Sequence, residues 1–410
     1  MAILSETQQS VNLQANLEKQ TMNSYSNCSS LYVHIPFCRR RCFYCDFAIT
    51  TAGVALQEKY ISALCQELAL VHRQLPNSQP LQTIYFGGGT PSLLPISLLA
   101  KVLDAIANLF GMAENCEISL EANPDSLEFP QLRAYAKLGI NRISLGVQAF
   151  QPELLQICGR DHTVDQIYRA VDYIHKSGIA NFNIDLISGL PKQTLTDWEY
   201  SLDQALQLSP THVSVYDLII EENTAFAKRY GHQKHILPSE ETTVSMYLLA
   251  REKLMDCGYD HYEISNFAHP SYQCRHNLNY WRNLEFYGVG MGATSYLQKQ
   301  RIDRPRKMRD YLQMITAWQE QGIPPSAPLL SPREELFDTV MQGLRLAEGI
   351  SLVKLATEFE APLITRLREI LEPFVARGWL KWQGDRLWAV PPDGWLFSDT
   401  IVGQLYQALL

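Results

Sequence analysis

The feature that most restricts the fold of this chain is an alternation of short β-rich runs with longer helical patterns. Six such runs recur across its first half: SLYVHIPF, TIYFGGG, EISLEANP, RISLGVQAF, NFNIDLISGL and HVSVYDLII. Each of the first five is followed by a segment that can form a helix, such as PISLLAKVLDAIANLFG, where apolar residues recur three and four positions apart. This alternation predicts βαβ units and a parallel sheet.

Six units predict an α/β fold with a partial (β/α)6, TIM-like barrel, since a closed barrel of this kind has eight. Polar or glycine residues stand where several predicted strands end, namely the cysteines near residue 40, GGGTP, Glu121, Gln148 and Asp185. In βα barrels the carboxyl ends of the strands surround one mouth, so these groups should face each other there. The open side of a partial barrel leaves room for a bulky substrate.

The pattern changes at about Ser331. PREELFDTVMQGLRL, SLVKLATEF and LITRLREILEPFVARG predict helices, and WLKWQGDRLWAV predicts a hairpin around Gln383–Asp385. Helices followed by a small wing indicate a C-terminal winged-helix-like domain. Residues 331–410 hold 8 Lys and Arg against 11 Asp and Glu, a balance that disfavours DNA binding. A structural or substrate-covering role is the better interpretation.

Charge and composition limit the classes of partner and the cellular compartment that we expect for this protein. The net charge of −8 argues against non-specific binding to nucleic acid or to acidic membrane surfaces. No apolar run approaches the roughly 20 residues of a membrane span. Residues 1–28 are polar and lack the features of a secretory signal, so we expect a disordered tail and a cytoplasmic protein. Six of the nine cysteines are scattered, as expected of reduced thiols.

The other three cysteines, Cys38, Cys42 and Cys45, lie within eight residues in FCRRRCFYCDF. A 4Fe–4S cluster takes four ligands, so three cysteines would hold it and leave one iron with a free position. A zinc site completed by Cys274 or by a histidine is an alternative, and so are three unrelated thiols. The run Arg39–Arg41 between them is interpreted as solvated; otherwise it offsets the cluster's charge or docks an acidic electron donor.

CRRRCFYC followed by YFGGGTP resembles the radical S-adenosylmethionine superfamily. The resemblance implies a 4Fe–4S cluster whose free iron takes the amino and carboxylate groups of S-adenosylmethionine. It also implies a low-potential electron donor, because one electron would cleave the cofactor to a 5′-deoxyadenosyl radical. Glycines at the end of a strand fit this reading, since they permit a close approach of the backbone to a ligand.

LYVHIPFC, YFGGGTPS, SLEANPD, LGVQAF, GRDH and NIDLISGLP, in this order, are similar to the oxygen-independent coproporphyrinogen III oxidase family and its relatives. The match runs from about Leu31 through the C-terminal domain. The resemblance places the family's S-adenosylmethionine contacts on eight residues: Tyr32, Gly88, Gly89, Thr90, Glu121, Gln148, Arg160 and Asp185. Taken singly, these have ordinary readings as well: core packing for the tyrosine, caps or ion pairs for the carboxylates, a surface cation for the arginine.

Two departures point to the HemW branch of haem chaperones. Phe47 stands where the oxidases carry a further cysteine, and HNLNYW matches the branch's H-N-x-x-Y-W signature. Imidazole is a common axial ligand of haem iron, so His276 is the candidate haem ligand, with Cys274 as an alternative. Tyr280 and Trp281 offer rings that stack on a porphyrin. A packed histidine beside aromatic residues is the competing interpretation.

Two functions therefore stand at this point. The first is a haem chaperone that transfers haem to acceptor proteins and carries a 4Fe–4S cluster and S-adenosylmethionine; whether it also turns over a substrate is left open. The second is a coproporphyrinogen III oxidase that decarboxylates propionates. The predicted domains are the tail (1–28), a radical S-adenosylmethionine core (29–260), a haem-motif region and linker (261–330) and the winged-helix-like domain (331–410).

Overall fold

The computed structural model describes residues 28–51, 53–74, 79–231 and 236–410. The predicted tail lies outside these residues except for its last member, Cys28, which is buried in the main hydrophobic core. Cys28 therefore belongs to the folded domain, because its side chain packs with the residues that cover the first strand.

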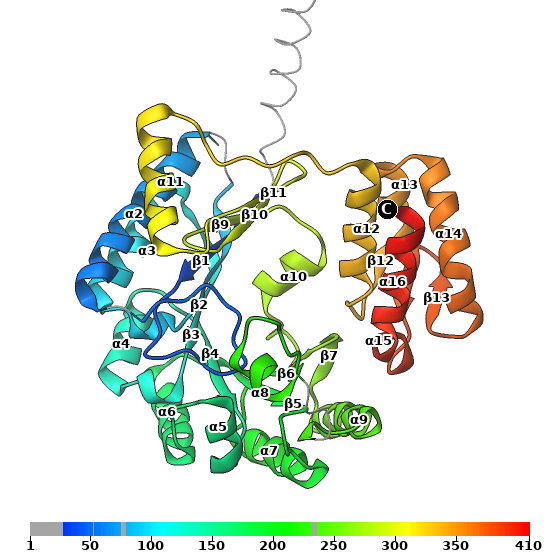
Figure 1. Cartoon of the computed structure of the whole chain (residues 1–410), viewed down its shortest axis with the longest axis horizontal. Helices are drawn as coiled ribbons and strands as arrows, with labels where there is room; N and C mark the ends of the chain where they lie inside the picture. The colour runs from blue at the N-terminus through cyan, green and yellow to red at the C-terminus, as the bar shows by residue number, and fades with distance from the viewer. Residues whose placement is uncertain (1–27, 52, 75–78, 232–235) are drawn as a thin grey trace, which may run out of the picture.

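A nine-stranded sheet forms the centre of the molecule, in the order β7-β8-β6-β5-β4-β3-β2-β1-β9 (Figure 1). Its first six strands pair in parallel with their sequence neighbours, as the alternation predicts. These strands are β1 (Ser30–Ile35), β2 (Leu81–Gly88), β3 (Met112–Ala122), β4 (Arg142–Gln148), β5 (Asn181–Ser188) and β6 (His212–Asp217). The α/β partial barrel is confirmed.

Short strands extend the sheet beyond the six. β8 (Asn266–Ala268) pairs antiparallel with β6, β7 (Asp260–Glu263) pairs antiparallel with β8, and β9 (Tyr287–Val289) pairs in parallel with β1. The region predicted as a motif and linker thus contributes to the sheet at both ends. Strands of three and four residues carry too little periodicity to be recognised in sequence. They satisfy backbone groups that β1 and β6 would otherwise leave unpaired.

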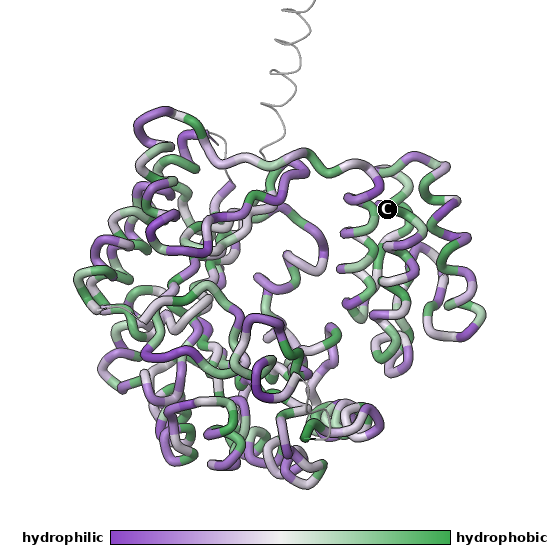
Figure 2. The backbone as a smooth tube through the Cα atoms, viewed as in Figure 1, coloured by the Kyte–Doolittle hydropathy of each residue, from purple (hydrophilic) through white to green (hydrophobic). Residues whose placement is uncertain are grey.

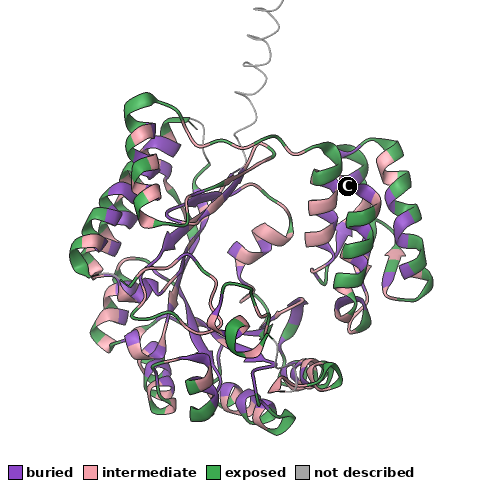
Figure 3. Ribbon diagram, viewed as in Figure 1, coloured by how far each residue is buried: buried purple, intermediate pink, exposed green. Residues whose placement is uncertain are grey.

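Helices cover the outer side of this sheet: α2 (Val54–Gln74), α3 (Ile96–Phe110), α4 (Phe129–Lys137), α5 (Pro152–Cys158), α6 (Val164–Ser177), α7 (Leu195–Gln207) and α9 (Glu240–Asp256). They bury one side and expose the other, whereas the strands between them are buried (Figure 3). The short helix α8 (Ala225–Tyr230) lies instead beside Phe43, whose carbonyl accepts from Phe226 N (2.9 Å). Thr163 and Thr194 begin α6 and α7 with capping boxes. Helix α11 (Met308–Gln321) packs against α2, where Tyr311 contacts Tyr60.

The C-terminal part has a hydrophobic core of its own, built from residues between Leu336 and Leu409. The predicted helices α12 (Pro332–Gly343), α13 (Leu352–Glu358) and α14 (Ala361–Ala376) are present, as is the hairpin β13 (Leu380–Gln383) and β14 (Arg386–Ala389). The sequence reading missed β12 (Ile350–Ser351), α15 (Asp393–Leu396) and α16 (Ser398–Leu409). β12 pairs with β14 and completes a three-stranded antiparallel sheet. Hydrophilic and hydrophobic segments alternate along these helices (Figure 2).

Helix α10 (Arg275–Trp281), which carries HNLNYW, lies between the sheet and the C-terminal part (Figure 1). Backbone bonds join the two parts directly: Ile264 N donates to Arg345 O (2.9 Å), and Ala347 N donates to Tyr262 O (3.0 Å). An extra hairpin, β10 (Thr294–Leu297) and β11 (Gln300–Asp303), precedes α11. None of the helices in the described part of the chain has both the length and the apolar character that crossing a bilayer requires.

Candidate cofactor site at the carboxyl ends of the strands

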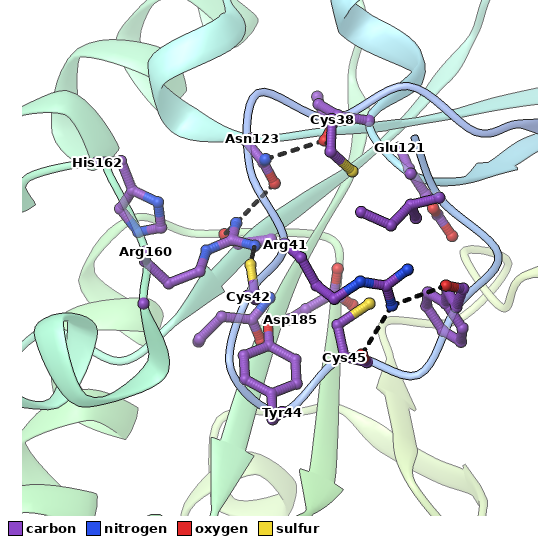
Figure 4. A pocket seen from close by; sticks show the side chains of 18 of the residues that line it. Cys38, Arg41, Cys42, Tyr44, Cys45, Glu121, Asn123, Arg160, His162 and Asp185 are labelled. Carbon is purple, nitrogen blue, oxygen red and sulfur yellow. Dashed lines mark hydrogen bonds between the residues drawn. The ribbon is translucent and has the colours of Figure 1, made fainter. Parts of the chain in front are cut away.

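A cavity of about 360 Å³ opens at the carboxyl ends of the parallel strands. We call it the strand-end cavity. The cysteine loop and the ends of β2 to β6 line it, and Figure 4 shows the side chains of the loop beside those of the strand ends. Of the eleven residues predicted for the cluster and S-adenosylmethionine, ten line it: Cys38, Cys42, Cys45, Gly88, Gly89, Thr90, Glu121, Gln148, Arg160 and Asp185.

Backbone hydrogen bonds hold the cysteine loop over the cavity. Cys38 N donates to Thr50 O (3.0 Å) and Thr50 N donates to Pro36 O (2.7 Å), which closes the base of the loop. Phe43 N donates to Cys158 O at the end of α5 (2.9 Å). The three thiols therefore come from a loop tied to two sides of the cavity.

The arrangement of the thiols fits a cluster better than a single ion. Among the described residues, no three His, Cys, Asp or Glu side chains converge closely enough to hold one metal ion. A zinc site needs that convergence, whereas in a 4Fe–4S cluster each thiolate binds a different iron. Cys274, the suggested fourth zinc ligand, is buried elsewhere with its Sγ 3.7 Å from Glu117 Oε1. Burial raises the pKa of Cys38 to about 11, so metal binding would release its proton.

The arginine run is exposed, as its solvated interpretation predicts, and each of its side chains also has a partner. Arg39 forms an ion pair with Asp125 (2.6 Å), and Arg40 with Asp161 (2.7 Å). Arg41 donates to the carbonyls of Cys45 (3.1 Å) and Phe47 (3.0 Å). Because these partners belong to the loop and the cavity wall, the run fixes the cysteine loop in place. Its ion pairs are individually weak at such exposure.

The glycines after β2 are required by close packing beneath the cysteine loop. Gly88 has φ +109°, and a Cβ there would lie 2.4 Å from the His34 ring. A Cβ on Gly89 would lie 2.7 Å from Phe37 O. Side chains larger than hydrogen therefore cannot fit at either position without moving the loop. Thr90 follows, and its hydroxyl lies 3.7 Å from Cys38 Sγ.

Two carboxylates stand at the floor of the cavity. Glu121 accepts hydrogen bonds from Tyr85 OH and Gly88 N, both at 3.0 Å. Burial, and secondarily the charge of Asp185, raises the pKa of Glu121 to about 7. Burial also raises the pKa of Asp185, which accepts hydrogen bonds from Ser144 and Asn183. A cationic ligand would relieve the cost of ionising this pair.

Arg160 faces the same space. Its Nη2 donates to Asn123 Oδ1 and to Gly146 O, both at 2.6 Å, and its Nη1 lies 3.5 Å from Cys42 Sγ (Figure 4). It is therefore not a surface cation. Gln148 has φ +72° beside a register shift between β4 and β5, a strained conformation of the kind found at functional sites.

Tyr32 is the one predicted S-adenosylmethionine residue that does not line the cavity. Its hydroxyl is hydrogen-bonded to His34 Nδ1 (3.0 Å), and its ring stacks on Tyr85 with centroids 6.3 Å apart. Tyr32 therefore lies behind Tyr85 and packs the floor. The sequence reading passed over Asn123, Ser144 and Gly146, although each stands in or beside a motif at a strand end. It also missed the apolar rim of Ile187, Tyr216, Leu218 and Ile219.

The HNLNYW helix has a different environment. His276 is 0% exposed, and its ring nitrogens lie 2.8 Å from Thr83 Oγ1 and 2.7 Å from Tyr280 OH. Glu117 accepts hydrogen bonds from the backbone N–H groups of Arg275 and His276 (both 3.1 Å). Burial, followed by the charge of Arg142, lowers the pKa of His276 to about 3. No residue of HNLNYW lines the strand-end cavity. In this conformation His276 is a packed, hydrogen-bonded histidine.

Comparison with known proteins agrees with this architecture. Residues 32–205 match the model of the radical S-adenosylmethionine superfamily, and residues 330–397 match that of the HemN C-terminal domain. The chain is 42% identical to the haem chaperone HemW of Synechocystis over 403 residues, covering 93% of this chain and 97% of the relative. Identity to the haem chaperone HemW of Escherichia coli is 32%, covering 91% and 97%.

Among solved structures, the chain resembles the coproporphyrinogen III oxidase HemN of Escherichia coli, described as a radical S-adenosylmethionine enzyme. The TM-score is 0.80 at 23% identity, covering 96% of this chain and 93% of that one. At this identity the likeness establishes a shared fold across both parts of the molecule.

Proposed function

Because this chain belongs to the HemW family of haem chaperones, we propose that it binds haem and transfers it to acceptor proteins. The observation that carries the proposal is the 42% identity over nearly the whole length of a haem chaperone. Haem is the cargo in this proposal. The setting we propose is the cytoplasm. The domain boundaries predicted from the sequence stand as part of the proposal, except that Cys28, predicted in the tail, belongs to the folded core.

We further propose that Cys38, Cys42 and Cys45 hold a 4Fe–4S cluster and that S-adenosylmethionine binds beside it. The fit of the thiols, which face one cavity without converging on one point, supports this assignment. Bound there, the cluster would supply a one-electron reductant and an open coordination position.

The remaining residues of the strand-end cavity would bind and orient S-adenosylmethionine. The paired carboxylates Glu121 and Asp185 would accept from cationic or hydroxyl groups, and Arg160 would bind an anionic group through its planar guanidinium. Gly88 and Gly89 would allow the ligand to approach the backbone. Tyr32 would act from behind, by fixing Tyr85 and through it Glu121.

The alternative function, coproporphyrinogen III oxidation, is less well supported. The solved oxidase shares the fold, but the curated relatives at 32–42% identity carry the haem chaperone name. Phe47 occupies the position of the oxidases' additional cysteine and is 62% exposed at the cavity rim. A phenyl ring can contact a flat apolar ligand but cannot replace a thiol.

The experiment that tests the proposal is a haem titration followed by transfer. The anaerobically reconstituted protein should bind haem with saturable Soret absorbance and then lose it to a stoichiometric excess of an apo-haemoprotein. Absence of saturable binding would overturn the function. S-adenosylmethionine should perturb the electron-spin resonance spectrum of the reduced protein, and an unchanged spectrum at saturation would overturn the cofactor assignment.

A further inference from the structure

A second cavity, of about 420 Å³, lies between the barrel and the C-terminal part. We call it the interdomain cavity. Its walls come from α9, β7, α10 with the turn before it, and the C-terminal part, and it shares no lining residue with the strand-end cavity. A volume of this size is in the range of small-molecule and cofactor sites.

Aromatic side chains dominate one wall: Tyr259, His261, Tyr262 and Trp395. The His261 ring stacks on Phe267 with centroids 3.9 Å apart and 16° between planes, and meets Trp395 edge-on at 4.5 Å. These contacts hold the rings in fixed orientations. A wall of fixed rings is suited to a flat, apolar ligand.

Two polar groups of this wall lack the partners that buried groups normally have. His261 is nine-tenths buried, and its Nδ1 has no hydrogen-bond partner among the described residues, nor does Nε of Arg251. Because Nε2 of His261 lies 3.3 Å from the carbonyl of Ile264, it carries the proton, and Nδ1 keeps a lone pair. Buried polar groups without partners are rare in folded proteins, and a ligand in the neighbouring cavity would account for both of these.

The cavity also accounts for the position of the HNLNYW helix. Leu278 of α10 and Arg282 just after it line the cavity, while Trp281 packs with Leu278, Leu346 and Tyr262 in one apolar cluster. The motif thus builds a wall of this cavity, whereas its histidine points away into bonds with Thr83 and Tyr280.

We propose that the interdomain cavity is the haem site, with the macrocycle against its aromatic wall and a propionate carboxylate paired with Arg251. The inference rests on the proposed function and deepens it. Arg251 supplies a guanidinium donor for a carboxylate. Ala347 and Glu348 are exposed at the rim, so part of the macrocycle can extend outward, where an acceptor protein can reach it.

The first test narrows the cavity from its rim. Ala347→Trp should weaken haem binding at least tenfold, measured by Soret titration of the full chain. Ala361→Trp, at an exposed site on α14 outside both cavities, is the matched control and should bind as wild type does. Equal affinity for Ala347→Trp and wild type would overturn the proposal, provided that both retain cluster iron and the same thermal midpoint.

The second test does not depend on steric blocking. Arg251→Leu should weaken haem binding several-fold but leave binding of haem dimethyl ester unchanged, because only free propionates need the guanidinium. Arg309→Leu, at an exposed surface site, is the control. Haem binding unaffected by Arg251→Leu would overturn the propionate assignment. If wild type binds no haem at all, the proposed function fails first; if it binds haem but neither cavity variant matters, only the site is wrong.

Discussion

The two motifs that stand out in the sequence, the cysteine loop and HNLNYW, occupy opposite kinds of environment. The cysteine loop lies over a cavity, and its thiols keep unsatisfied ligating capacity. The HNLNYW helix is packed between two parts of the molecule, and its histidine is fully hydrogen-bonded. Both motifs contain residues that commonly bind metals. The cysteine thiols face a cavity that can hold a ligand, whereas both ring nitrogens of His276 are already hydrogen-bonded within the fold.

The largest expected effect tests whether the cysteine loop is a ligand site. Replacing Cys38, Cys42 or Cys45 by alanine should remove nearly all cluster iron, since each thiolate would bind its own iron and, among the described residues, no other cysteine lines the cavity. Iron and acid-labile sulfide after anaerobic reconstitution measure this. Cys257→Ala, at an exposed cysteine, is the control. Stoichiometric zinc without iron in the wild type would contradict the cluster.

The next prediction tests whether His276 of HNLNYW is a packed residue that stabilises the fold. His276→Ala should lower the free energy of unfolding by about 2–4 kcal/mol, because it leaves a cavity and unpaired partners. Urea denaturation at pH 7 measures this. A stability equal to wild type, together with a lost or shifted Soret band, would show that His276 is a haem ligand after all.

The same variant has a characteristic pH dependence. The folded pKa of His276 is lowered to about 3, so the unfolded chain binds a proton below its ordinary pKa of 6.5 while the folded chain does not. The contribution of the neutral His276 imidazole to the free energy of unfolding of the wild type is therefore lost as the pH falls from 6.5 toward 3. The stability gap between wild type and His276→Ala should shrink by about 2 kcal/mol between pH 7 and pH 5. A constant gap would contradict a buried neutral imidazole.

A smaller effect is expected on the affinity for S-adenosylmethionine, through the ionisation of Glu121. With a pKa of about 7, Glu121 is mostly ionised at pH 8 and mostly protonated at pH 6. If the carboxylate holds a cationic or hydroxyl group of S-adenosylmethionine, affinity should fall roughly tenfold over that range. Equilibrium dialysis measures it. Glu121→Gln should bind more weakly with a nearly flat profile, and an unchanged profile would remove Glu121 from the site.

The smallest expected signal concerns the C-terminal part. Its excess of carboxylates should prevent measurable duplex DNA binding by the full chain at physiological salt, in a fluorescence anisotropy titration. Salt-sensitive binding at micromolar concentration that is abolished by Arg366→Ala or Arg368→Ala on α14 would contradict the assignment of this part to a structural or substrate-covering role.

The parallel sheet and most of the strand-end cavity could be predicted from the sequence. The alternation of strands and helices indicated the sheet, and the positions of the motifs indicated the edge formed by the carboxyl ends of its strands. Glu121 is the last residue but one of β3 and Asp185 lies in the second half of β5, and both line the cavity at that edge. The environment of His276 could not be predicted, because Thr83 and Glu117 approach it from distant strands. The interdomain cavity was also beyond reach, since β7, α10 and Trp395 meet only in the folded chain.

The most direct test of the central claim uses one anaerobic preparation of the reconstituted protein, divided in two. One half receives haem; the other receives coproporphyrinogen III, reductant and S-adenosylmethionine. A haem chaperone should give saturable haem binding in the first half and neither carbon dioxide nor protoporphyrinogen in the second. Release of carbon dioxide with formation of protoporphyrinogen over several turnovers would contradict the account and identify the protein as the oxidase.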